Sequence, residues 1–97
     1  MPDFRVVIVN PSGLHARPAA RFVEVASGFP CEIMVKNLTS DSRTINAKSI
    51  LGILTLGVEQ GHEILISAAG EQAEVAGETL VRLVREELPA IDEPNPS

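Results

Sequence analysis

Alternating and β-branched apolar residues mark four short strands along the chain. Residues 4–9 are mostly Val, Ile and Phe, and residues 31–36 alternate apolar with polar side chains. Residues 43–46 and 62–67 are briefer segments of the same kind, bounded by turn-forming residues. The polar stretch 37–42 joins the second strand to the third, so this pair is predicted to form a hairpin.

Three further segments carry apolar residues at the 3.6-residue spacing of a helix. The first begins just after His15 and stops at residues 27–30, where Gly and Pro end it. The second spans residues 47–56, and the third runs from residue 71 to about residue 88, where Pro89 is expected to stop it. The residues predicted to face inward are Ala19, Phe22, Val23 and Ala26 in the first helix and Ala73, Ala76, Leu80, Leu83 and Val84 in the third.

The resulting order is strand, helix, strand, strand, helix, strand, helix. It predicts an α+β fold, an open-faced two-layer sandwich in which three helices cover one face of a four-stranded antiparallel sheet. We expect one domain over residues 1–88. Residues 89–97 are acidic and rich in proline, and we expect them to form a disordered tail.

Composition then narrows the class of protein. Of 97 residues, 44% are hydrophobic and only three are aromatic, all Phe, so the core must be aliphatic. A net charge of −5 with no basic run argues against a nucleic-acid binder. No apolar run reaches the roughly 18–20 residues of a membrane span, and the first residues lack the features of a signal peptide, so a cytoplasmic location is expected. Cys31 is the only cysteine, and the cysteine and histidine residues do not have the spacing of a metal site, so no metal or cofactor is expected. The short chain suggests a monomer.

Two further residues carry simpler expectations. His62 lies at the edge of the fourth strand with no ligand or carboxylate at useful spacing, so it is expected to be a surface polar residue. Gly77 sits inside the third helix, where glycine costs about 1 kcal/mol relative to alanine. Close packing of this position against the sheet would explain its presence.

His15 stands where a loop becomes a helix, and this position has chemical consequences. The unpaired N–H groups expected at Ala16 and Arg17 make a helix N-terminus attractive to anions. The Arg17 guanidinium and the Ser12 hydroxyl would add donors suited to phosphate oxygens. A neutral imidazole keeps a lone pair for nucleophilic attack. The segment therefore combines a nucleophile with an anion site, although spacing alone is equally compatible with an ordinary surface histidine.

The second helix is apolar over more of its circumference than one sheet face can cover. Leu51 and Leu54 are therefore predicted to remain exposed, and an exposed apolar patch on a small protein is typical of a docking surface. A fully buried helix, or even a strand, is the alternative that periodicity leaves open. Ser49 is placed to cap the start of this helix, and Gly57 to close it.

Two segments resemble the signatures of a known family. Residues 13–19 (GLHARPA) are similar to the active-site signature of HPr, the histidine phosphocarrier family of the bacterial phosphoenolpyruvate:sugar phosphotransferase system. Residues 46–57 (NAKSILGILTLG) resemble the second signature of that family. The resemblance implies that His15 accepts a phosphoryl group on Nδ1, as pros-phosphohistidine, from enzyme I and passes it to sugar-specific IIA components. Such a protein is a stoichiometric carrier and not an independent catalyst.

The resemblance also implies roles for neighbouring residues. Arg17 would stabilise the phosphoryl oxygens during transfer, and Ser12, Ala16 and Arg17 would bind the phosphate. Ser49 matches the family's regulatory serine, which an HPr kinase/phosphorylase phosphorylates in some systems; a phosphate there would oppose an acidic partner. The residues expected to contact partner proteins are Ala20, Arg21, Ile50, Leu51 and Leu54.

Other functions stay open at this point. A paralogous carrier of a nitrogen-regulatory or dihydroxyacetone phosphotransfer branch would share the same signatures. A hydrolase using His15 with Ser12 lacks an acidic third member at a suggestive spacing. An anion-binding or scaffolding module would retain its function if His15 were replaced by glutamine, which a carrier could not.

Overall fold

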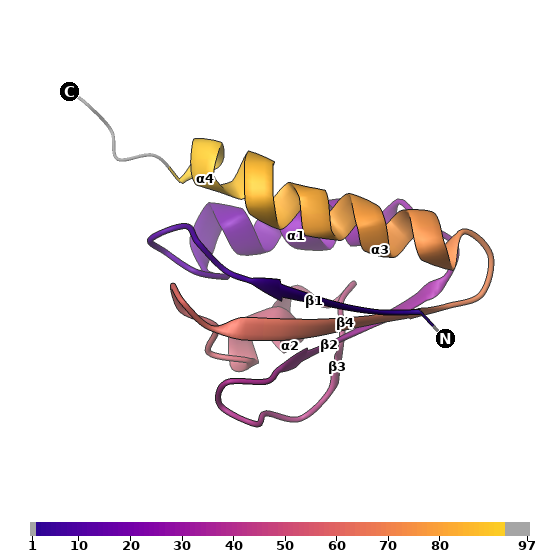
Figure 1. The fold of residues 1–97 in the computed structure, drawn as a ribbon, viewed down its shortest axis with the longest axis horizontal. Helices are drawn as coiled ribbons and strands as arrows, with labels where there is room; N and C mark the ends of the chain where they lie inside the picture. Colours follow the sequence, from indigo (N-terminus) through magenta and orange to yellow (C-terminus); the bar gives the residue numbers. More distant parts are fainter. Residues whose placement is uncertain (1, 93–97) are drawn as a thin grey trace.

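The computed structural model describes residues 2–92 and contains the predicted four-stranded sheet (Figure 1). The strands are β1 (Asp3–Val7), β2 (Glu32–Asn37), β3 (Ile45–Asn46) and β4 (Glu63–Ala69). Their order across the sheet is β1-β4-β2-β3, and every neighbouring pair is antiparallel. β4 and β2 are therefore the two inner strands, and β4 follows the predicted hairpin of β2 and β3 in the chain.

Helices cover one face of this sheet. They are α1 (Ala16–Ser27), α2 (Ile50–Thr55) and α3 (Ala73–Arg82), which continues through the π-helical turn η1 (Leu83–Glu87) into α4 (Leu88–Ile91). Figure 1 shows α1 and α3 lying over the same side of the strands, while α2 contacts α1 and β3. The fold is the predicted open-faced α+β sandwich. Within residues 2–92, no helix is long and apolar enough to span a membrane.

Alternation along the strands separates the core from the open face of the sheet. In β4, Ile64, Ile66 and Ala68 are buried, whereas the residues between them are partly exposed. The core is aliphatic, as the composition predicts, with Phe22 as its largest fully buried side chain. The inward-facing residues predicted for the first and third helices are all buried except Val23, which packs against the core while partly exposed.

Gly77 fixes the distance between α3 and the edge strand β1. A Cβ atom added at Gly77 would collide with the aromatic ring of Phe4 on β1. The ring fills the space that a side chain would need, which confirms that this glycine serves close packing against the sheet. The loss of helix propensity is thus offset by contact between helix and strand.

The prediction that Pro89 ends the last helix is wrong. Pro89 lies in the first turn of α4, directly after the π-helical turn, where the Leu88 N–H bonds to the carbonyl of Leu83 five residues earlier. In a regular α-helix the proline ring would clash with the carbonyl four residues before it. The wider turn lets the helix continue, and the expected tail boundary at residue 89 is too early. Residues 93–97 of that expected tail lie outside the described residues.

Candidate functional site

His15 occupies the N-cap position of α1, so it lies at the helix start as predicted. Its backbone is extended, with φ −129° and ψ 163°, and its side chain makes no capping hydrogen bond. The carbonyl of His15 accepts the first helical bond, from the N–H of Ala19 at 3.4 Å. The imidazole is partly exposed at the helix start and, within residues 2–92, has no hydrogen-bond partner. It is therefore open to a partner molecule.

The loop before His15 is held close to the segment that follows α2. Gly13 has φ +62°, and a Cβ atom at this position would overlap the backbone of Val58. The next residue, Leu14, is buried and donates its N–H to the carbonyl of Val58 at 3.0 Å. A glycine is therefore needed both for the backbone conformation and for the close approach. His15 comes directly after Leu14, whose position is fixed by burial and by the bond to Val58.

Ala16 enters the helix in a strained conformation. Its φ is +51°, in the left-handed region that costs a residue with a Cβ atom about 1–2 kcal/mol. Strain of this kind persists only where the surrounding structure imposes it, and it concentrates at functional sites. Here it is imposed between the anchored Leu14 and the buried Pro18 of the first helical turn.

Two backbone N–H groups and one guanidinium surround the start of α1. In the described part of the chain, the N–H groups of Ala16 and Arg17 have no acceptor, and Pro18 has no N–H to offer. The exposed Arg17 side chain donates from Nη2 to the carbonyl of Ile91 at 3.3 Å. The predicted anion-binding groups are thus brought together beside His15, with Arg17 held by one long, exposed bond.

Ser12 already has an anionic partner, which the sequence reasoning missed. Its hydroxyl donates to Oδ1 of Asp92 at 2.8 Å, and its N–H donates to Oδ2 at 2.6 Å. The buried Asn10 donates from Nδ2 to the same Oδ2 at 3.1 Å and to the carbonyl of Gly13 at 2.9 Å. The expected phosphate donor Ser12 is therefore engaged by a carboxylate from the end of α4.

These contacts hold the pKa of Asp92 below its ordinary value of 3.8. The hydrogen bond from the Ser12 N–H is the largest cause, opposed by partial burial. The side-chain donors of Asn10 and Ser12 and the positive charge of Arg17 lower the pKa further. Asp92 is thus ionised at neutral pH. The positive charge of Arg17 acts both on Asp92 and on the anion-binding groups at the start of α1.

The apolar residues of the short helix α2 that were predicted to remain exposed are exposed in the structure. Leu51 is 73% exposed and Leu54 is 39% exposed, as is Ile50 at 40%. Ser49 caps the helix by accepting the N–H of Gly52 at 3.0 Å. The apolar patch, defined here as Ile50, Leu51 and Leu54, lies on a helix that contacts α1. The alternative of a fully buried helix or a strand is thereby excluded.

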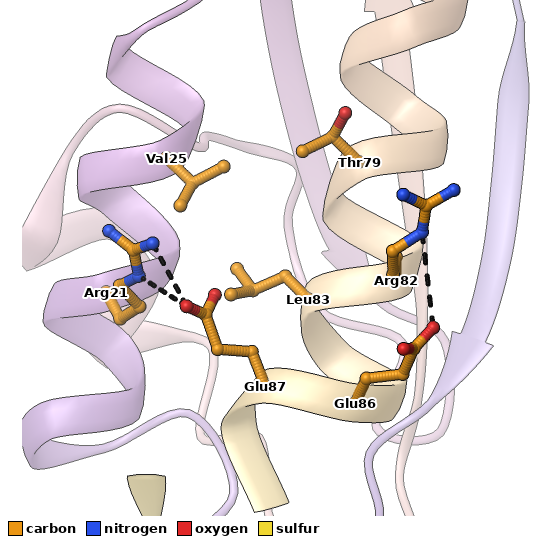
Figure 2. A pocket seen from close by; sticks show the side chains of 7 residues that line it. All are labelled: Arg21, Val25, Thr79, Arg82, Leu83, Glu86 and Glu87. Atoms are coloured by element: carbon orange, nitrogen blue, oxygen red, sulfur yellow. Dashed lines mark hydrogen bonds and ion pairs between the residues drawn. The ribbon is translucent and has the colours of Figure 1, made fainter. Parts of the chain in front are cut away.

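Arg21, expected to contact partners, is paired within the molecule. Its guanidinium bonds to Glu24 at 2.7 Å and to Glu87 at 3.0 Å, and these contacts raise its pKa, Glu87 contributing most. Figure 2 shows the Glu87 pair bridging a groove between α1 and the last helix, with Val25 and Leu83 between the two elements. His15 does not line this groove, while the neighbouring Ala20 remains exposed.

His62 proves to be more than a surface polar residue. Its Nδ1 accepts the N–H of Glu59 at 3.2 Å and faces Nδ2 of the fully buried Asn37 at 3.1 Å. The same amide donates to the carbonyl of Leu56. Because both neighbours are donors, His62 is held here as an acceptor at Nδ1, which is a structural role. The expectation failed because Asn37 lies far from His62 in sequence.

Comparison with known proteins decides the family. A family model described as "PTS HPr component phosphorylation site" matches residues 3–86. This chain belongs to the HPr family. It is 43% identical over 84 residues to the phosphocarrier protein HPr of Vibrio cholerae, covering 87% of this chain and 95% of that protein. A crystal structure of HPr from Thermoanaerobacter tengcongensis matches with a TM-score of 0.84 and 45% identity, covering 90% of this chain and 94% of that one. Over most of its length the chain is thus similar to phosphocarrier proteins of this family.

HPr-like sequences also occur within longer proteins. The chain is 43% identical over 77 residues, 79% of its length, to the multiphosphoryl transfer protein of Haemophilus influenzae. It spans only 15% of that protein, and 18% of the corresponding protein of Vibrio cholerae. A second Thermoanaerobacter tengcongensis structure, of an HPr dimer, matches with a TM-score of 0.69 and 45% identity, covering 90% of this chain and 97% of that one.

Proposed function

We propose that His15 carries the phosphoryl group in this member of the HPr family. The lone pair of Nδ1 attacks the phosphorus of a phosphohistidine on enzyme I. The new N–P bond forms as the donor's N–P bond breaks, and that electron pair stays on the donor's ring nitrogen. A histidine of a sugar-specific IIA component then takes the group from His15 by the same exchange. The observation that carries the proposal is that, within residues 2–92, the imidazole of His15 and the two N–H groups beside it have no hydrogen-bond partner, with Arg17 next to them.

The surroundings of His15 suit transfer between proteins. Phosphoryl transfer depends mainly on in-line positioning and on stabilising charge spread over three oxygens. The N–H groups of Ala16 and Arg17 would bind the transferred group at the positive end of α1. The Arg17 guanidinium is exposed and can exchange the Ile91 carbonyl for phosphoryl oxygens, a stronger, charge-assisted bond.

The test is phosphorylation by a purified enzyme I. The protein is mixed with phosphoenolpyruvate, Mg²⁺ and a catalytic amount of enzyme I, and followed by intact mass and ³¹P NMR. We expect one acid-labile phosphate on the native chain and none on His15→Ala or His15→Gln. His62→Ala is the matched histidine control and should still be phosphorylated. A phosphorylated His15→Ala variant would overturn the assignment.

The same assay distinguishes the branch of the pathway. Enzyme I of a sugar system should phosphorylate this chain faster than the donor proteins of a nitrogen-regulatory or dihydroxyacetone branch. The apolar patch on α2 would provide this selectivity, because it is exposed and lies on a helix that contacts α1. Faster phosphorylation by another branch's donor would assign the carrier to that branch.

Ser49 is the proposed regulatory site. Its Oγ accepts the N–H of Gly52, and a phosphate there would add negative charge next to Leu51. Incubation with ATP and a purified HPr kinase/phosphorylase should add one phosphate to the native chain and none to Ser49→Ala. If the native chain takes no phosphate, or if Ser49→Ala takes one, this part of the proposal fails and transfer through His15 is unaffected. We propose that the carrier acts as a monomer in the cytoplasm, where enzyme I and IIA components would meet it.

A further inference from the structure

The end of the last helix is fastened to the loop that carries His15. Asp92 accepts three hydrogen bonds, from the N–H and hydroxyl of Ser12 and from the amide of Asn10. Figure 1 shows α4 ending beside the loop between β1 and α1. Asp92 lies beyond residue 86, where the match to the family model ends. The family signature therefore gives this residue no role.

Asp92 and a phosphoryl group on His15 would depend on the same positive charge. The guanidinium of Arg17 bonds to the carbonyl of Ile91, next to Asp92, and its charge helps to keep Asp92 ionised. His15 lies between Ser12 and Arg17 in the chain, so its phosphorylation adds a dianion to a neighbourhood that already holds a carboxylate. Like charges close together disfavour one another, and both anions compete for Arg17.

Within residues 2–92, the cations of the last helix, Arg82 and Arg85, are not among the groups that shift the pKa of Asp92. Glu87 is paired with Arg21 on α1, and Glu86 is paired with Arg82 at 4.0 Å (Figure 2). These arginines are therefore engaged within the molecule. Among the charged side chains of residues 2–92, Arg17 is the cation that acts on Asp92.

We propose that Asp92 is a positioning residue of the His15 loop and that its docking opposes phosphorylation of His15. This inference rests on the proposed function. In the unphosphorylated protein, Asp92 holds Ser12 and Asn10 in place. In the phosphorylated protein, Arg17 turns to the phosphoryl oxygens and Asp92 is bound less tightly. Linkage then requires that docked Asp92 lower the equilibrium phosphorylation of His15 by the same factor.

A competition experiment measures this factor directly. Phosphorylated wild-type protein is mixed with an equal amount of ¹⁵N-labelled Asp92→Asn variant and a catalytic amount of enzyme I, without phosphoenolpyruvate. Enzyme I passes the phosphoryl group reversibly between the two carriers, and intact mass gives the final distribution. We expect an exchange constant of about 3 in favour of the variant, somewhat below the roughly 5- to 150-fold of typical couplings, because the site is exposed and screened. Asp3→Asn, at the far end of β1, is the charge-matched control and should give a constant near 1.

The Ser12 amide proton of the wild-type protein gives an independent readout. We expect its NMR signal to move upfield and its solvent exchange to accelerate when His15 is phosphorylated, because the bond to Asp92 weakens. An exchange constant of 1 or below for Asp92→Asn, or an unchanged Ser12 amide, would overturn the coupling while leaving the carrier function intact. If the wild-type chain takes no phosphate from an active enzyme I, the proposed function fails and the coupling fails with it. A residue that only stabilised the loop would not raise phosphorylation when neutralised.

Discussion

At the scale of single residues, the strained backbone of Ala16 is the feature that distinguishes this helix start from an ordinary one. Its φ of +51° directs the first N–H groups of α1 while keeping His15 extended. A strained residue lowers the free energy of unfolding, and the structure that imposes the strain also fixes the local backbone geometry. The stability cost can be measured by substitution.

Ala16→Gly should stabilise the protein, or at least not destabilise it, because glycine adopts positive φ without penalty. Relief of about 1–2 kcal/mol of strain is partly offset by the greater freedom of glycine in the unfolded chain, about 0.4–1 kcal/mol. Urea denaturation followed by circular dichroism measures the difference. Ala20→Gly, at an exposed position inside α1, is the control and should cost about 0.5–1 kcal/mol. Equal losses in both variants would show that Ala16 is not strained.

The depressed pKa of Asp92 predicts a pH-dependent contribution to folding. Its pKa is lower in the folded protein than its ordinary 3.8, so ionised Asp92 favours the folded state. This contribution is fully present above the unfolded pKa and is lost as the pH falls through the folded value. The urea midpoint of the wild-type protein should therefore exceed that of Asp92→Asn at pH 7, and the gap should close below pH 4. A gap that stays constant down to pH 3 would contradict the assignment, and Asp3→Asn again controls for the change in net charge.

At the scale of elements, the contact between Gly77 and Phe4 sets how closely α3 approaches the sheet. Gly77→Ala should destabilise the protein by about 1–2 kcal/mol, because overpacking costs roughly 1–3 kcal/mol and alanine recovers part of it through helix propensity. Thermal or urea unfolding measures the loss. The double variant Phe4→Leu with Gly77→Ala should recover stability relative to the single variant. Stabilisation by Gly77→Ala alone would mean that the two elements move apart freely.

Local patterns were enough to predict most elements, because their causes lie within a few residues. The cap at Ser49 and the exposure of Leu51 follow from helix geometry. The position of His15 at a helix start follows from the turn-forming residues before it. The contact between Ser12 and Asp92 joins residues 80 positions apart, and no sequence period reports such a contact. The error at Pro89 had a similar origin, since a π-helical turn depends on how the whole helix packs.

At the scale of the whole molecule, the His15 segment and α2 are neighbours that meet the same partners in our proposal. Leu51→Ala should raise the KM for phosphorylated enzyme I by about 5- to 10-fold, the effect of truncating a residue that contributes 1–1.4 kcal/mol to an interface. Stability should change by less than about 0.5 kcal/mol, because the side chain is largely exposed.

Val75→Ala is the matched control for Leu51, since Val75 on α3 is 56% exposed and lies outside the apolar patch. Its KM for phosphorylated enzyme I should equal that of the wild-type protein. Equal effects of the two substitutions would indicate that overall surface hydrophobicity, and not the patch on α2, governs docking.

The π-helical turn at residues 83–87 accommodates one more residue than a regular α-helical turn would. Each residue of an α-helix advances the chain by about 100° around the axis, so one additional residue would normally rotate everything after it away from its target. A wider turn takes up that residue locally, and the segment beyond it keeps its direction. Deleting one residue within 83–87 should restore regular α-helical bonding and bring the Pro89 ring against the carbonyl one turn earlier, so the deletion should break the helix before Asp92. The wider turn is therefore what allows the last helix of this chain to continue through Pro89 and reach the loop that carries His15.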